Sequence, residues 1–109
     1  MQRLGFVLLA TALACSMVAM AAPPEFTLVI TNHRFEPSEL TVPAGQKIKL
    51  VVDNRDATPE EFESRSLNRE KIVPGRSKST IWIGPLKPGS YDFAGEYHEA
   101  TARGRIIAK

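Results

Sequence analysis

The chain has 109 residues, and its 14 Lys and Arg against 12 Asp and Glu exclude the strongly basic surface that nucleic-acid binding requires. A single Cys excludes any disulfide within the chain and, with it, the small disulfide-rich folds. Neither a nucleophile elbow nor a Gly-rich loop before a helix occurs, which excludes serine-hydrolase and phosphate-loop chemistry.

The first residues have the three parts of a secretory signal peptide. Arg3 supplies a positive start, residues 4–14 form an apolar run, and residues 19–21 (Ala-Met-Ala) form a small-x-small cleavage site. The apolar stretch nearly reaches the length of about 20 residues that spans a membrane, but its small residues and the two prolines that follow favour cleavage. We therefore expect a signal peptide over 1–21, a single secreted domain over 22–109, and no stable membrane insertion after cleavage. Whether Cys15 is lipidated stays open.

The predicted mature domain contains no sulfur, because Cys15 and all three Met lie in the leader. Thiolate metal centres and disulfides are therefore excluded from it. A domain of this length can just bury a sufficient hydrophobic core without such cross-links.

Short runs of β-branched and aromatic residues recur along the domain and indicate strands. In chain order they lie at residues 26–30, 40–42, 48–52, 72–73, 80–83, 91–93 and 106–107. Turn signals with Pro or Gly stand between them at residues 36–38, 43–45, 73–75 and 87–89. No stretch of the domain keeps a helical period, and we expect an irregular or helical turn at residues 64–70. The pattern predicts an all-β sandwich of about seven to eight strands.

Three segments resemble the cupredoxins in the order and spacing of their residues. Residues 35–48 carry an F-x-P-x-x-L-x-V-x-x-G pattern that is similar to the first cupredoxin hairpin, and residues 54–59 are similar to the loop before the first histidine ligand. Residues 86–93, followed by His98 and residues 104–107, resemble the last hairpin. The resemblance covers nearly all of the domain and implies a Greek-key β-sandwich.

The usual ligands of a blue-copper centre are two His, one Cys thiolate and, in most cases, an axial Met. By the same resemblance, Glu60 stands at the position of the first His and Gly95 at that of the Cys. Ala102 or Arg103 stands at the position of the Met, and only His98 matches. We therefore expect no blue-copper centre and no ordinary blue electron carrier.

Carboxylates replace sulfur at this end of the predicted sandwich. One loop carries residues 60–63 (Glu-Glu-Phe-Glu) and another carries residues 96–99 (Glu-Tyr-His-Glu). The candidate metal ligands are Glu60, Glu61, Glu63, Glu96, His98 and Glu99. Because carboxylate oxygens are hard ligands and imidazole is borderline, such a site favours Cu(II), Fe(III), Mn(II) or Zn(II) over Cu(I). Binding by several carboxylates also favours Fe(III) over Fe(II), so it would make Fe(II) easier to oxidise.

The choice among these carboxylates depends on strand alternation, which places Glu61 and Glu63 on one face and Glu60 with Phe62 on the other. Position matching to the cupredoxins favours Glu60, whereas the Glu-Phe-Glu spacing favours the outer pair. We expect the pair, together with His98, to form the core of the site. The two glutamates that flank His98 are either ligands or supporting groups.

His33 is the other histidine of the chain, and sandwich topology places it near the same end. The strand after it runs away from this end, and residues 48–54 return toward it. His33 is either a further ligand or a solvated histidine in a turn, and the sequence leaves both interpretations open.

The Glu-Phe-Glu spacing, residues 68–75 and residues 86–89 also resemble EfeO-type cupredoxin-like domains and their single-domain periplasmic relatives in bacterial iron-uptake systems. That resemblance implies a periplasmic protein that binds Fe(II), Fe(III) or Cu(II) through acidic residues. Its partners would be an inner-membrane iron permease and other periplasmic iron-uptake proteins. Any enzymatic role would be a part in ferrous iron oxidation.

Two other functions fit the same residues. A copper chaperone or copper-resistance protein would use the same site for another metal. A metal-free interaction domain would keep only the sandwich, and a run such as residues 60–63 would then be a charged strand edge that prevents association.

Overall fold

The structure is a computed structural model that describes residues 5, 7–12 and 21–109. Arg3, Cys15 and most of the predicted cleavage motif lie outside the described residues, so the signal peptide stays a prediction. In the described part of the chain, no helix has the length and apolar character needed to cross a membrane.

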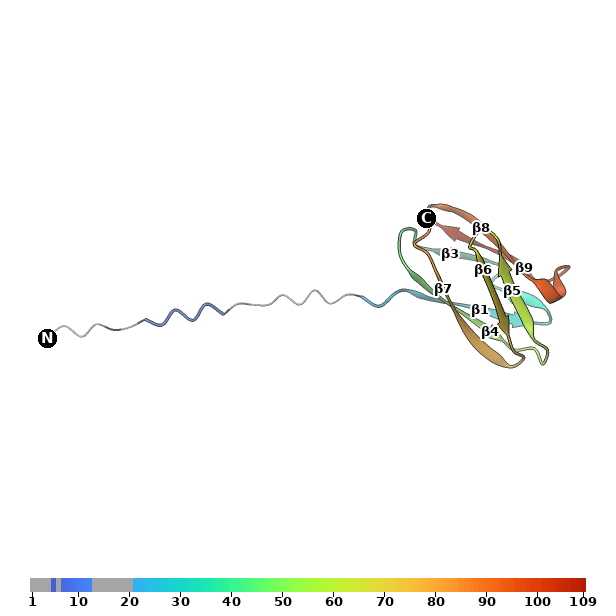
Figure 1. Cartoon of the computed structure of the whole chain (residues 1–109), viewed down its shortest axis with the longest axis horizontal. Helices are drawn as coiled ribbons and strands as arrows, with labels where there is room; N and C mark the ends of the chain where they lie inside the picture. Colours follow the sequence, from blue (N-terminus) through green and yellow to red (C-terminus); the bar gives the residue numbers. More distant parts are fainter. Residues whose placement is uncertain (1–4, 6, 13–20) are drawn as a thin grey trace.

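Nine strands and one short helix form the described domain (Figure 1). The strands are β1 (Glu25–Thr31), β2 (Arg34–Glu36), β3 (Glu39–Val42), β4 (Ile48–Asn54), β5 (Glu60–Ser64), β6 (Arg69–Val73), β7 (Ser77–Ile83), β8 (Gly89–Gly95) and β9 (Arg103–Ala108). The 3₁₀ helix η1 (Glu96–His98) follows β8 directly. The predicted all-β sandwich is confirmed, with β2 and β5 added to the strands that the sequence pattern indicates.

The strands make two sheets, one in the order β2-β1-β4-β7 and the other in the order β3-β9-β8-β5-β6. Both sheets are mixed, because β1 pairs with β4 and β3 pairs with β9 in parallel, whereas the other pairs are antiparallel. Burial alternates along the strands, as in β4, where every second residue is buried. The inner faces meet in one hydrophobic core.

Three aromatic residues fill the centre of this core. Phe62 and Phe93 stack with ring centroids 5.2 Å apart, and Phe35 meets Phe93 edge to face at 4.9 Å. All three are buried, and Phe62 is fully so, as its alternation with the glutamates of β5 predicts. The core therefore ties β2, β5 and β8 together beneath one end of the sandwich.

The segment from Phe35 to Gly45 differs from the hairpin that its cupredoxin-like pattern suggests. β2 pairs with β1 in one sheet and β3 pairs with β9 in the other, so the chain crosses between the sheets at Pro37. Proline has no N–H to donate to a ladder, which ends β2 and allows the change of sheet. The expected irregular turn is also shorter than predicted, since β5 continues to Ser64 and β6 begins at Arg69.

Three connections come together at one end of the sandwich. The parallel register of β1 and β4 pairs Ile30 with Asn54, so the β1–β2 turn lies beside the β4–β5 loop. The antiparallel register of β5 and β8 pairs Phe62 with Gly95, which brings the start of β5 to η1. Figure 1 shows η1 and the β1–β2 turn at the same end of the domain. This end carries the candidate site.

Candidate metal centre

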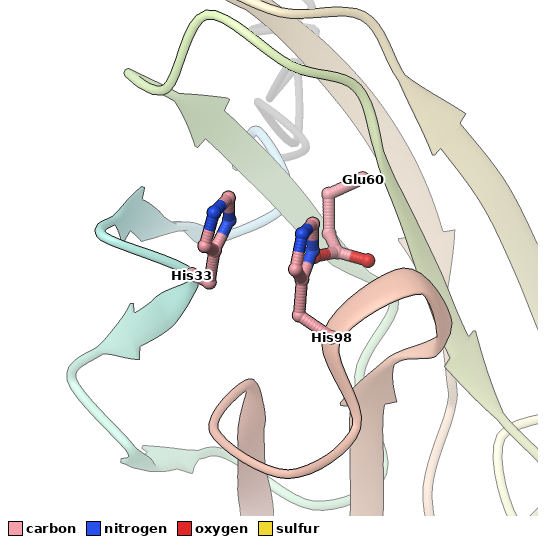
Figure 2. A group of neighbouring side chains, drawn as sticks. All are labelled: His33, Glu60 and His98. Atoms are coloured by element: carbon pink, nitrogen blue, oxygen red, sulfur yellow. The ribbon is translucent and has the colours of Figure 1, made fainter.

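Three side chains, in or directly beside these three connections, meet at the end of the sandwich (Figure 2). His33 lies in the β1–β2 turn, Glu60 begins β5, and His98 ends η1. Their ligand atoms all lie within 4.8 Å of one another. Residues that are distant in sequence therefore form one compact group of two imidazoles and one carboxylate.

Glu60 is the buried member of this group, with 1% of its surface exposed. Its Oε2 lies 2.5 Å from Nδ1 of His98, and its Oε1 accepts the backbone N–H groups of Glu61 and Tyr97, each at 3.0 Å. A buried carboxylate is tolerated only when it is paired and hydrogen-bonded. These contacts meet that need and hold both carboxylate oxygens in a fixed position.

The two imidazole rings lie face to face, with centroids 3.5 Å apart and planes 8° from parallel. In Figure 2, His98 stands between His33 and the Glu60 carboxylate. The main chain holds His98 in place, because its carbonyl accepts the N–H groups of Thr101 at 3.1 Å and Ala102 at 2.8 Å. The sequence left the role of His33 open, and the structure places it in the group.

The turn that carries His33 has an uncommon backbone. Asn32 and His33 have φ of 51° and 56°, in the left-handed region that a two-residue hairpin turn requires. Such values are uncommon for residues other than glycine and need support from the surroundings. Asp56 supplies that support by accepting the N–H of Asn32 at 2.8 Å and that of His33 at 2.9 Å. Thr101 adds a bond from its hydroxyl to the His33 carbonyl at 2.7 Å.

Asp56 is itself fixed by the β4–β5 loop. Its N–H donates to Oδ1 of the buried Asn54 at 3.1 Å, and its carbonyl accepts the N–H of Arg76 at 2.8 Å. The pKa of Asp56 lies below its ordinary value of 3.8, chiefly because the His33 N–H binds the charged form. Partial burial opposes this effect, whereas the Asn32 N–H and the Coulombic attraction of the two nearby imidazoles, His33 and His98, act in the same direction. The ionised carboxylate is therefore the form that holds the turn.

We expect Asp56→Ala to lower the free energy of unfolding by about 2 kcal/mol at neutral pH, since the hydrogen bonds to a charged acceptor are lost. Because folding lowers this pKa, the contribution is fully present above the ordinary value of 3.8 and disappears as pH falls through the folded value. Urea unfolding between pH 7 and pH 2 should thus show that the difference in the free energy of unfolding between wild type and Asp56→Ala becomes smaller in acid. Asp53→Ala is the control, since Asp53 pairs with Arg55 rather than with the turn.

A pH-independent difference, or an equal loss in Asp53→Ala, would contradict this role for Asp56.

The other predicted ligands lie elsewhere. Glu61 forms a second, more exposed acidic group with Glu70 and Glu96, in which the charge of Glu61 raises the pKa of Glu96. Glu63 and Glu99 line an open groove of about 480 Å³ on the outer side of β5 and β8. The structure therefore does not bring the expected pair, Glu61 and Glu63, together with His98. Burial alternates along β5, so the pair faces outward and Glu60 faces the site.

The donor set suits a hard or borderline ion. Imidazole and carboxylate bind Cu(II), Zn(II) and iron, while Cu(I) prefers sulfur, which residues 22–109 lack. Glu60 can act as a ligand or, as in carboxylate–histidine–metal groups, hold Nδ1 of His98 while the other ring nitrogen binds the ion. Both roles need the carboxylate beside His98, where the structure has it.

Comparison with known proteins gives the family. A family model described as "Cupredoxin-like domain" matches residues 5–108. An uncharacterized protein of Rickettsia prowazekii (strain Madrid E) is 46% identical over 83 residues, which cover 76% of this chain and 66% of that protein. The chain thus spans slightly less than two thirds of the length of this relative.

Solved structures share the fold at low sequence identity. Auracyanin A, a "blue" copper protein from Chloroflexus aurantiacus, is similar with a TM-score of 0.68 and 14% identity over 81% of this chain and 100% of that one. The metal-binding domain of the Cu(I)-exporting P-type ATPase CopA of Streptococcus pneumoniae has a TM-score of 0.62 and 10% identity over 78% of this chain and 84% of that one. With the family match, these findings show that the chain belongs to the cupredoxin-like domain family.

Proposed function

We propose that this protein is a periplasmic cupredoxin-like protein that binds copper or iron through His33, Glu60 and His98 and forms no blue-copper centre. The observation that carries the proposal is the meeting of a buried, fully hydrogen-bonded carboxylate with two stacked imidazoles. The three residues offer imidazole nitrogens and a carboxylate oxygen within 4.8 Å of one another, and this is a donor set that a hard or borderline cation would favour. The leader predicted at residues 1–21 supports the periplasmic location.

Copper is supported by the neighbours in fold, since the descriptions of auracyanin A and of the ATPase domain both name copper. Two imidazole nitrogens and one carboxylate oxygen suit Cu(II) better than Cu(I). A copper chaperone or copper-resistance protein is therefore the second candidate function.

Iron is supported by the resemblance of residues 61–63, 68–75 and 86–89 to EfeO-type domains. On this proposal the protein assists high-affinity iron uptake together with an inner-membrane permease and other periplasmic proteins. An anionic oxygen ligand favours Fe(III), which makes Fe(II) easier to oxidise. If the site assists that oxidation, one electron passes from Fe(II) to an acceptor such as dioxygen or a redox protein, and Fe(III) is the product.

Titration of the purified protein with Cu(II), Fe(III), Zn(II) and, without oxygen, Fe(II) tests the proposal. An ion that binds only the folded state stabilises it by about 2.7 kcal/mol at a free concentration one hundred times Kd, which we expect to raise Tm by about 10 °C or more. Cu(II) or iron should produce this shift. Glu63→Gln is the matched control, because it removes an outward-facing carboxylate from the same strand and should leave the shift unchanged.

The outcomes separate the candidate functions. Tight binding of Fe(II) or Fe(III), with faster ferrous oxidation in the presence of the protein, supports the iron-uptake role. Tight Cu(II) binding with no effect of iron supports the copper-handling role. A Tm that no metal changes would contradict both roles and leave a metal-free interaction domain.

A further inference from the structure

Gly95 is the last residue of β8 and lies directly against Glu60. Its φ of −88° and ψ of 108° are ordinary extended values, so the backbone does not require glycine here. A Cβ atom at this position would lie 2.6 Å from Cδ and 2.8 Å from Oε1 of Glu60, and 2.7 Å from Cβ of Ala102. Close approach of another side chain is therefore what demands glycine.

Neither element can move aside easily. The N–H of Gly95 donates to the carbonyl of Ala102 at 2.8 Å, and the β5–β8 register pairs it with Phe62. The carboxylate of Glu60 is held by hydrogen bonds to the N–H of Tyr97 and to the imidazole of His98. The space between β5 and β8 is thus too small for both groups. It can hold either the carboxylate of residue 60 or a side chain at position 95.

We propose that Gly95 is the residue that determines the class of ligand in the site. By leaving this volume free, it lets β5 supply an oxygen ligand beside His98 and keeps the site suited to hard and borderline ions. A side chain at position 95 would point at the place of the carboxylate, so a thiol there would lie beside the same imidazole once Glu60 is shortened. The metal part of this inference rests on the proposed function, whereas the steric part does not.

The steric part is tested by Tm values of metal-free wild type, Gly95→Ala, Glu60→Ala and the double variant. We expect Gly95→Ala to lower Tm by about 4 °C or more in the wild type, as overpacking does in a domain of this size, and by clearly less in the Glu60→Ala background. The contact with Ala102 is the same in both backgrounds, so it cancels in the comparison. Additive effects would overturn the inference.

Gly104→Ala is the matched control for this cycle. A Cβ on Gly104 would meet the Phe93 ring at 2.4 Å and the Ser38 carbonyl at 2.6 Å, and its three nearest atoms belong to these two residues rather than to Glu60. Its cost should therefore be the same whether or not Glu60 is present. A cost that changes with Glu60 would show that the coupling is not specific to Gly95.

Cu(II) titration then tests the ligand class. Gly95→Ala should bind Cu(II) about tenfold or more weakly than wild type, because the carboxylate is displaced. The Glu60→Ala/Gly95→Cys variant should gain the intense visible thiolate-to-Cu(II) absorption that wild type and Glu60→Ala lack, and it should bind Cu(I) more tightly than wild type. Unchanged affinity in Gly95→Ala, or a folded Cys variant without that absorption, would overturn the inference.

Failure of the proposed function would look different, since wild type itself would then bind neither Cu(II) nor iron. In that case the metal-free Tm cycle still reports on the contact between Gly95 and Glu60.

Discussion

Replacing Glu60 by Gln is expected to weaken Cu(II) binding by about 10- to 100-fold while leaving the fold in place. The amide oxygen can still accept the N–H groups of Glu61 and Tyr97, and the amide N–H can donate to Nδ1 of a neutral His98. The substitution therefore keeps these hydrogen bonds and removes only the negative charge of residue 60. Competition titrations should show the weaker affinity, and the Tm of the metal-free protein should stay close to that of wild type.

Glu60→Ala separates the charge from the hydrogen bonds. Truncation leaves two part-buried N–H groups without their acceptor, at up to about 1–3 kcal/mol for each, so this variant should lose stability as well as affinity. Glu63→Gln should lose neither, since Glu63 lines the outer groove. Wild-type affinity in Glu60→Gln would show that this carboxylate does not belong to the metal site.

Replacing His98 by Ala is expected to have the largest effect. The affinity for Cu(II) should fall by about 100-fold or more. The same change should destabilise the metal-free protein by about 3–5 kcal/mol, because a buried carboxylate loses its partner. The side chain of Glu60 is 2% exposed and that of His98 28%, so the imidazole is the partner that lies between this carboxylate and solvent. The loop itself should persist, since Thr101 and Ala102 bind the main-chain carbonyl of residue 98.

Two variants distinguish a structural from a metal-binding role for His98. His98→Gln can donate an amide N–H to Glu60, so it should recover much of the stability and little of the metal affinity. Glu60→Gln/His98→Ala removes the uncompensated charge and should also be more stable than His98→Ala alone. Full recovery of Cu(II) binding in His98→Gln would contradict a ligand role for the imidazole.

The fold could largely be predicted from the sequence, because alternating β-branched residues and Pro or Gly turns indicate most strands directly. The strand pattern does not indicate β5, because three of its five residues are glutamates, a composition that suggests a loop or a charged edge. The crossing at Pro37 was also not predicted. Its cupredoxin-like pattern identifies the segment, but which sheet each half joins depends on pairing with β1 and β9, far away in the chain.

The candidate site was predicted in part. Alternation correctly separated Glu60 and Phe62 from Glu61 and Glu63, but it cannot tell which face of β5 the loop with His98 folds over. That choice follows from the pairing of Phe62 with Gly95, which a single sequence does not reveal. Whether Glu60 is a ligand stays a prediction that the variants above test.

The support for His33 was beyond the reach of sequence reasoning. Asp56 lies 23 residues after His33, and its role depends on a turn whose two residues both have positive φ. The stacking of His33 on His98 joins two residues that are far apart in the sequence. The close contact of Gly95 with Glu60 likewise appears only once β5 and β8 are paired.

Pulsed electron paramagnetic resonance of the Cu(II)-loaded protein tests most directly whether three connections supply one metal site. We expect the couplings of two imidazole nitrogens in wild type, and of one in His33→Ala and in His98→Ala. A spectrum without imidazole coupling, or one that neither substitution changes, would contradict a shared site at this end of the sandwich.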